Sequence, residues 1–124
     1  MDMEGKGDLE GASRLFLQAW NEATDDFEKF TAAHYVARHQ KTVADKLKWD
    51  ETALQLAHNI NDETIKGAYP SLYLNIAKCY EDLNDFDNAS KNYALALSFA
   101  NQLPESGYGH MLKGGIMKGM ERVK

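Results

Sequence analysis

The chain of 124 residues has very few of the residues that interrupt helices. It contains only two prolines, Pro70 and Pro104, and neither glycine nor proline occurs from residue 12 to residue 66. Strands joined by hairpins need turn residues at short intervals, so this shortage argues against a β fold. Residues of high helix propensity fill the same stretch, and the sequence therefore predicts an all-α protein.

Cysteine is nearly absent as well, since Cys79 is the only one in the chain. A single cysteine excludes an intramolecular disulfide and any zinc or iron–sulfur site that is built from several cysteines. It also fits a reducing compartment, and we expect a cytoplasmic protein. A catalytic Cys79 would need a histidine partner and an activating environment, so a small packed thiol is the favoured interpretation.

The chain also lacks long apolar runs and an excess of positive charge. No stretch approaches the roughly 18 apolar residues of a membrane span, and the first residues have no apolar core like that of a signal peptide. Fourteen basic residues stand against nineteen acidic ones, which gives a net charge of −5. Because nucleic acids are bound by basic surfaces, we expect neither a nucleic acid nor a membrane as the partner.

Apolar residues at three- and four-residue spacing predict about six helices with short connections. Thr24 is expected to cap the second helix, Asn61 or Asp62 the fourth, and Asp85 the fifth. Pro70 must begin or kink the fourth helix, because proline lacks an N–H group. The expected helices cover residues 8–20, 24–40, 43–59, 62–83, 85–100 and 108–122.

An internal repeat is the most informative pattern. A small residue, an aromatic residue four positions later and a second small residue after three more occur near both ends: Ala12, Phe16, Ala19 and Ala89, Tyr93, Ala96. Ala19 lies 34 residues before Ala53, which lies 43 residues before Ala96. In helical repeats, small residues let paired helices approach closely, while aromatic residues fill the gaps between neighbouring pairs.

This pattern resembles the tetratricopeptide repeat, in which a bulky residue, a Leu-Gly pair and a tyrosine on one helix precede Ala-x3-aromatic on the next. In this chain the residues that match the first helix of the repeat lie in the helix expected over 62–83. They are Tyr73, Ile76, Ala77 and Tyr80. The resemblance implies a single domain, residues 1–124, that forms an α-α superhelix of antiparallel hairpins. Its parts would be a half repeat 7–23, repeats 24–60 and 62–103, and a capping helix 107–123. Segments 69–75 and 103–109 are also similar to small bacterial tetratricopeptide-like proteins, which implies a bacterial source.

The middle unit departs from the repeat pattern. His34, Lys46 and Asp50 stand at positions that are alanine or tyrosine in the last unit, and Trp49 is expected to take over the aromatic role.

In the capping helix, apolar residues recur along one face at Leu112, Ile116, Met120 and Val123. Gly114, Gly115 and Gly119 disfavour a helix, so their expected use is a close approach to the preceding helix.

No pattern of catalytic or metal-binding residues emerges. No two of His34, His39, His58 and His110 have the four-residue spacing of a metal pair. We expect His34 to be packed and hydrogen-bonded and the other three to lie at the surface. The glycines of segment 107–115 lack the strand and the lysine of a nucleotide-binding loop, and acidic pairs fit helix caps. No enzyme activity, metal or cofactor is therefore expected.

The remaining prediction is a binding surface. In tetratricopeptide arrays the first helix of each hairpin lines a concave groove, so the resemblance implies a groove for a protein or peptide partner. Its residues would be Thr31, Tyr35, Arg38, His39, Ser71, Asn75, Lys78 and Asp82. Arg38, Asn75 and Lys78 are of types that hold a peptide carboxylate or backbone, although an ordinary polar helix face would look similar.

Two other interpretations follow from the same residues. The chain could be a regulator that binds a small acidic ligand or a signalling peptide near Arg38, His39 and Lys78. Apolar surface left uncovered around Leu15 and Trp20 would instead favour a homodimer or another partner.

Overall fold

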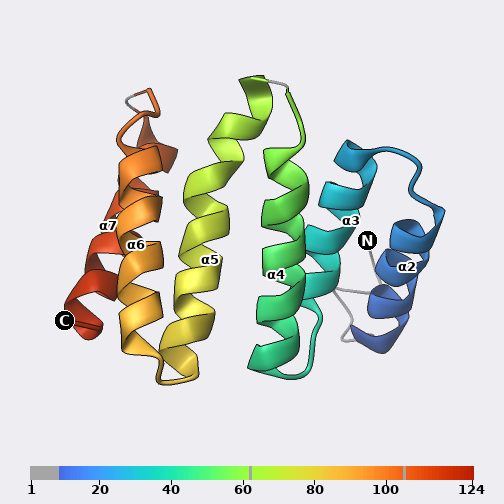
Figure 1. Cartoon of the computed structure of the whole chain (residues 1–124), viewed down its shortest axis with the longest axis horizontal. Helices are drawn as coiled ribbons and strands as arrows, with labels where there is room; N and C mark the ends of the chain where they lie inside the picture. Colours follow the sequence, from blue (N-terminus) through green and yellow to red (C-terminus); the bar gives the residue numbers. More distant parts are fainter. Residues whose placement is uncertain (1–8, 62, 105) are drawn as a thin grey trace. The chain divides into compact units, whose positions relative to one another are not determined.

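A computed structural model describes residues 9–61, 63–104 and 106–124. Within these residues the chain forms six α-helices and one 3-10 helix and has no strand, which confirms the all-α prediction (Figure 1). Its Cα atoms cluster into two compact units, Met1–Ile60 and Asn61–Lys124. None of the helices described is long and apolar enough to cross a membrane.

The first unit contains α2 (Leu9–Glu22), α3 (Asp26–Arg38) and α4 (Val43–His58), and α3 packs against both of the others. Small side chains line the contact between α3 and α4, which lets the two helices approach closely. The buried apolar residues of this hairpin are Ala32, Ala33, Val36, Ala37, Leu47, Ala53 and Ala57.

The start of α3 differs from the expected one. Asp25 caps the helix, with its Oδ1 atom accepting a hydrogen bond of 2.8 Å from the backbone N–H of Glu28. The hydroxyl of Thr24 instead donates to the Glu28 carboxylate at 3.0 Å. Threonine and aspartate are both good N-cap residues, so the local sequence alone does not show whether Thr24 or Asp25 caps the helix.

The second unit contains a 3-10 helix, η1 (Glu63–Ala68), followed by α5 (Tyr69–Asp82), α6 (Phe86–Ala100) and α7 (Gly107–Arg122). The single helix expected over 62–83 is therefore wrong, because only its part from Tyr69 onward is α-helical. Pro70 lies in the first turn of α5, where its missing N–H costs no hydrogen bond. The proposed cap Asp62 lies outside the described residues, and Asn61 does not cap α5, which follows Ala68.

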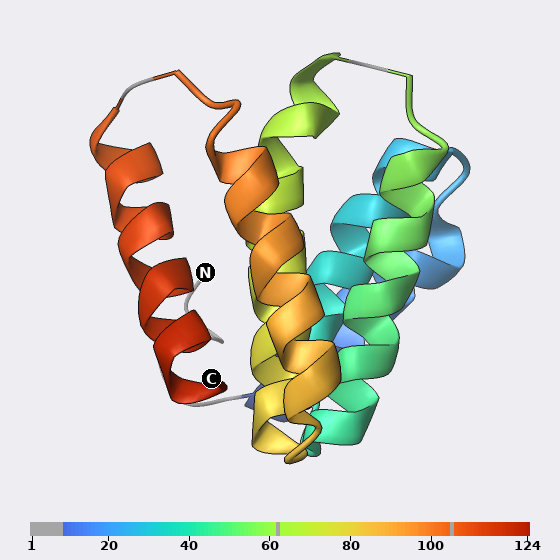
Figure 2. The same cartoon turned by 60° about the vertical axis from the view of Figure 1, so that its left-hand side comes forward.

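A three-residue connection, residues 83–85, joins α5 to α6. Asn84 adopts a left-handed conformation with φ 63°. The N–H of Asn84 bonds to Glu81 O and that of Asp85 to Tyr80 O, both at 2.9 Å, which closes the end of α5. Asp85 then caps α6 through the backbone N–H of Asn88, as predicted. The chain consequently reverses, and α6 runs antiparallel to α5 (Figure 2).

The offset of 43 residues relates interior positions of the two hairpins. Ala53 and Ala96 are both fully buried, while Asp50 and Tyr93 are 1% and 0% exposed. The position that carries Tyr93 in the second hairpin carries Asp50 in the first, and it is buried in both. Lys46 lies 3.0 Å from the buried Asp50 carboxylate.

In the middle unit Trp49, next to Asp50, supplies the aromatic side chain that contacts a neighbouring helix. Its ring meets Trp20 edge-on, with 5.2 Å between ring centroids. In the half repeat, by contrast, Ala19 is exposed although the pattern placed it on the packed face. The repeat pattern therefore predicts the buried positions of the α3–α4 and α5–α6 hairpins better than those of α2.

Candidate functional site

The predicted groove residues belong to two helices in different units. Tyr35, Arg38 and His39 lie at the end of α3, where the ring of Phe16 from α2 covers part of them. Phe16 stacks on Tyr35 at 4.9 Å and meets His39 at 5.0 Å between ring centroids. The guanidinium carbon of Arg38 lies 5.6 Å from the centre of the Tyr35 ring. Thr31, one turn earlier, is half-buried.

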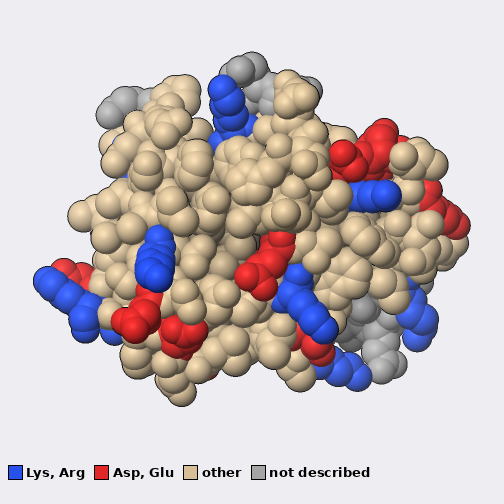
Figure 3. Space-filling model, in the orientation of Figure 1, with Lys and Arg blue, Asp and Glu red and all other residues tan. Residues whose placement is uncertain are grey.

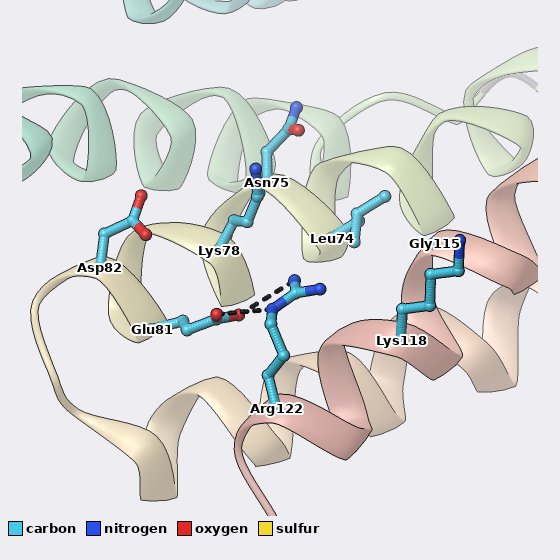
Figure 4. A pocket seen from close by; sticks show the side chains of 8 residues that line it. All are labelled: Leu74, Asn75, Lys78, Glu81, Asp82, Gly115, Lys118 and Arg122. Atoms are coloured by element: carbon cyan, nitrogen blue, oxygen red, sulfur yellow. Dashed lines mark hydrogen bonds and ion pairs between the residues drawn. The ribbon is translucent and has the colours of Figure 1, made fainter.

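On α5, three of the four predicted residues line a pocket of ≈ 490 Å³ within the second unit. These three are Asn75, Lys78 and Asp82, whereas Ser71 lies outside its lining. The other wall comes from α7, which the sequence analysis treated only as a cap (Figure 4). The full lining consists of Leu74, Asn75, Lys78, Glu81, Asp82, Gly115, Lys118 and Arg122.

A hydrogen-bonded ion pair joins the two walls of this pocket, α5 and α7 (Figure 4). Nε of Arg122 donates to Oε2 of Glu81 at 2.7 Å, and Nη2 donates to Oε1 at 3.2 Å. The hydroxyl of Tyr93 on α6 also donates to Oε1 of Glu81, at 2.7 Å. Three helices therefore meet at one carboxylate, which fixes α7 against the α5–α6 hairpin.

This network sets the charge of its members. The hydrogen bond from Arg122 lowers the pKa of Glu81 below its ordinary value. Burial and the hydrogen bond to Glu81 raise the pKa of Tyr93 to about 12. At neutral pH the pair is therefore ionised and the buried phenol is neutral.

Two lysines line the pocket. Lys78 on α5 and Lys118 on α7 make no ion pair with another residue in the described part of the chain. With Arg122 they set three cations against the carboxylates of Glu81 and Asp82, which leaves the lining with one net positive charge. The chain as a whole carries −5, and the face in Figure 3 shows small groups of both signs.

The histidines and the cysteine lie elsewhere. His58 and His110 are exposed, and Cys79 is buried at 2% exposure. His34 is packed as expected, but its buried Nδ1 atom has no hydrogen-bond partner, so the expectation of a hydrogen-bonded ring is wrong for that atom. No group of three potential metal ligands occurs within residues 9–61, 63–104 and 106–124.

Three pocket residues on α7 carried a signal that the sequence analysis missed. Gly115, Lys118 and Arg122 follow one another at three- and four-residue spacing and so lie on one flank of the helix. That flank adjoins the buried stripe of Leu112 and Ile116. The spacing shows that the three share a side, but only the packing of α7 beside α5 shows what they face.

Comparisons with known proteins identify no relative. The tetratricopeptide resemblance consequently remains an expectation drawn from the residue pattern. Neither a protein-family model, nor a curated protein, nor a solved structure matches the chain.

Proposed function

We propose that the chain is a non-catalytic binding module of the tetratricopeptide type, which holds a peptide or protein partner through its helical surface. The pocket between α5 and α7 is the observation that supports this function. Its polar groups stand on helices rather than on loops, so they are held in position before a partner arrives.

The lining residues suggest how a partner would be held. The amide of Asn75 can both donate to and accept from a peptide backbone, while Lys78 and Lys118 attract a negative group. Glu81 and Arg122 satisfy each other and keep α7 in place. Recognition and support are thus divided between different residues of one pocket.

The same lining supports a module without catalysis. A general base works best with a pKa near the working pH, whereas Arg122 moves the pKa of Glu81 away from neutrality. The lining also offers no serine, cysteine or histidine as a nucleophile or base.

A ligand-responsive regulator is the second candidate, and the size of the pocket favours it. A volume of ≈ 490 Å³ lies within the range of about 300–1,000 Å³ for small-molecule sites. A small dicarboxylate such as succinate would then raise the melting temperature, and the rise would grow with the logarithm of its concentration above the Kd. The peptide-binding function predicts no such rise.

The test is a selection of random displayed peptides on the immobilised chain, repeated with Lys78→Ala combined with Lys118→Ala. We expect peptides enriched on the unmodified chain to bind the double variant at least about 10-fold more weakly, because each lost cation contact removes a charge-assisted bond. Lys48→Ala with Lys91→Ala removes the same charge from exposed positions outside the pocket and serves as the control. No enrichment, or equal loss in both variants, would contradict the proposal.

A further inference from the structure

Two glycines of α7 have no role in packing the helix against its neighbours. A Cβ atom at Gly114 or at Gly115 would have nothing within 4 Å. The expected close approach of helices at these two positions is therefore wrong, and it holds only for Gly119, where a Cβ would overlap the ring of Tyr93. The side of α7 that carries the two glycines is consequently open.

Methionines are exposed on the same side of the helix. Leu112 and Ile116 are buried, and Gly114, midway between them in the sequence, lies on the opposite side of α7. Met111 and Met117, three residues before and after Gly114, are 66% and 57% exposed. The open side of α7, defined by Met111, Gly114 and Met117, thus offers apolar surface that the packing of the second unit leaves uncovered.

Positive charge surrounds this apolar surface. Residues 107–124 carry four basic side chains and one acidic one, whereas the rest of the chain carries ten basic and eighteen acidic ones. The single acid, Glu121, lies 3.7 Å from Lys124. Lys113, one turn before Met117, makes no ion pair with another residue in the described part of the chain. The open side of α7 therefore suits an acidic partner surface that also presents an apolar group.

The first unit carries a surface of that kind where α2 meets α3. Phe27 is 53% exposed there, and Lys29 is the only basic residue from residue 15 to residue 37. Acidic side chains gather over this connection (Figure 3). Four acids near Phe27 are exposed and form no ion pair within the described residues: Glu22, Asp25, Asp26 and Glu28. Phe27 and these four acids form the α2–α3 corner.

We propose that the chain binds a second copy of itself, with the α2–α3 corner of one copy lying on the open side of α7 of the other. Phe27 packs against Met117, and the acids of the corner face the basic residues of α7. Neither Lys113 nor Met117 lines the pocket between α5 and α7, so this inference is independent of the proposed peptide binding.

Charge complementarity identifies a second copy as the occupant. Each copy carries an acidic corner and a basic helix, so two copies attract each other through unlike surfaces and repel each other through like ones. Methionine adapts its shape to its neighbours, and its sulfur makes favourable contacts with aromatic rings, so Met117 suits Phe27. Because the two surfaces differ, the contact is heterologous, and it joins further copies unless the assembly closes into a ring.

Light scattering by the full chain along a concentration series is the first test. Because the surfaces are small and charged, we expect the mean mass to rise above the 14.0 kDa of one chain between about 1 µM and about 1 mM. At about 1 M salt the Debye length falls to about 3 Å, and the mass should return toward that of one chain. The mass of a single chain at every concentration, or association that salt leaves unchanged, would overturn the inference.

Charge reversal on either surface tests the pairing. Asp26→Lys with Glu28→Lys makes the corner basic, and Lys113→Glu with Lys124→Glu makes α7 acidic. Each double variant then carries two surfaces of like charge, so its association should weaken by at least about 10-fold. Lys48→Glu with Lys91→Glu is the control for the α7 variant, because it changes the net charge equally at exposed positions elsewhere.

Rescue separates a broken contact from a damaged fold. An equimolar mixture of the two double variants pairs a basic corner with an acidic helix, and an acidic corner with a basic helix. We expect this mixture to associate about as strongly as the unmodified chain, and all four reversals combined in one chain should do the same. Failure of both rescues, or an effect of the control as large as that of the α7 variant, would overturn the inference.

The apolar part of the contact has its own test. Phe27→Ala and Met117→Ala each remove one of the two apolar side chains and should weaken association by at least about 10-fold. Leu95→Ala, which removes a 43% exposed side chain from α6, is the control and should leave association unchanged. If all three variants associated like the unmodified chain, the assignment of Phe27 to Met117 would be wrong and the proposed contact with it.

Discussion

Glu81 shows how a single side chain holds the C-terminal helix. Its side chain is 17% exposed and accepts hydrogen bonds from Arg122 on α7 and from the fully buried Tyr93 on α6. A buried hydroxyl that loses its hydrogen-bond acceptor is no longer compensated for the free energy of its desolvation. The contribution of Glu81 therefore includes the satisfaction of Tyr93 as well as the ion pair.

Replacing Glu81 by glutamine should lower the free energy of unfolding by about 1–2 kcal/mol near neutral pH, because the ion pair is lost while the shape is kept. Denaturant unfolding followed by circular dichroism measures this change. The control is Asp82→Asn, which removes the same charge from the adjacent exposed position and should have a much smaller effect.

The same variant predicts the pH dependence of stability. The hydrogen bond from Arg122 lowers the pKa of Glu81 in the folded state below the ordinary value of 4.5. The stabilisation from Glu81 is therefore present above that value and is lost as pH falls below it. The difference between the unmodified chain and Glu81→Gln should shrink on acidification. A difference that stays constant with pH would show that the ionised carboxylate is not what stabilises α7.

Among the elements, the contact of α6 with α7 depends on one glycine. A Cβ atom at Gly119 would overlap Cε1 and Cζ of Tyr93. That ring is fully buried and its hydroxyl is held by Glu81 and Arg122, so it has little room to move.

Gly119→Ala should therefore destabilise the fold by about 1–3 kcal/mol, although alanine favours the helix itself. Gly114→Ala, whose Cβ would meet nothing, should stabilise the chain by up to about 1 kcal/mol. Thermal unfolding of the two variants gives the comparison. Equal shifts of the same sign would mean that helix propensity alone decides and that the Tyr93 contact is unimportant.

The elements also show what local sequence can specify. Asp85 caps α6 through a hydrogen bond within one turn, and Pro70 fits the first turn of α5 because its missing N–H is not needed there. Both roles were predictable because they depend only on residues close in sequence. The alanines at an offset of 43 residues were predictable as well, since each hairpin repeats the same packing. The 3-10 helix before Tyr69 gave no distinct signal.

The candidate site was less predictable than the fold, because it depends on contacts distant in sequence. Arg122 and Glu81 are 41 residues apart, and no spacing rule connects them. Asn75 and Lys78 were predicted as groove residues through the tetratricopeptide resemblance and line the pocket, whereas Lys118 was not predicted because α7 was expected only to cap the fold. An exposed glycine such as Gly115 has no periodic signature at all.

At the scale of the whole chain, the two units differ in what they bury. In the second hairpin the positions 77, 89 and 93 carry Ala77, Ala89 and Tyr93, and all three are fully buried. The corresponding positions of the first hairpin carry Asp50, which is buried, and His34 and Lys46, which are half-buried. Burying polar groups costs free energy even when they are paired. The first unit should therefore be the less stable of the two.

His34 makes that difference sensitive to pH. Burial lowers the pKa of His34 below its ordinary value of 6.5, and the positive charges of Arg38 and Lys46 act in the same direction, while Asp50 opposes them. The neutral ring is thus favoured in the folded state. Stability is present above the ordinary pKa and is lost as pH falls below it. Because the ring is partly open to solvent, the loss should not exceed about 1 kcal/mol.

Tryptophan fluorescence can follow this loss, because Trp20 and Trp49 are the only tryptophans and both belong to the first unit. The denaturant midpoint of the tryptophan signal should fall as pH is lowered from about 7.5 to about 5.5. His34→Ala places the residue of the second hairpin at this position and should remove most of that dependence. Amide exchange at Gly119 in the second unit is the control and should be unaffected by the substitution. If the midpoint of His34→Ala fell as far as that of the unmodified chain, another group would have to be the titrating residue.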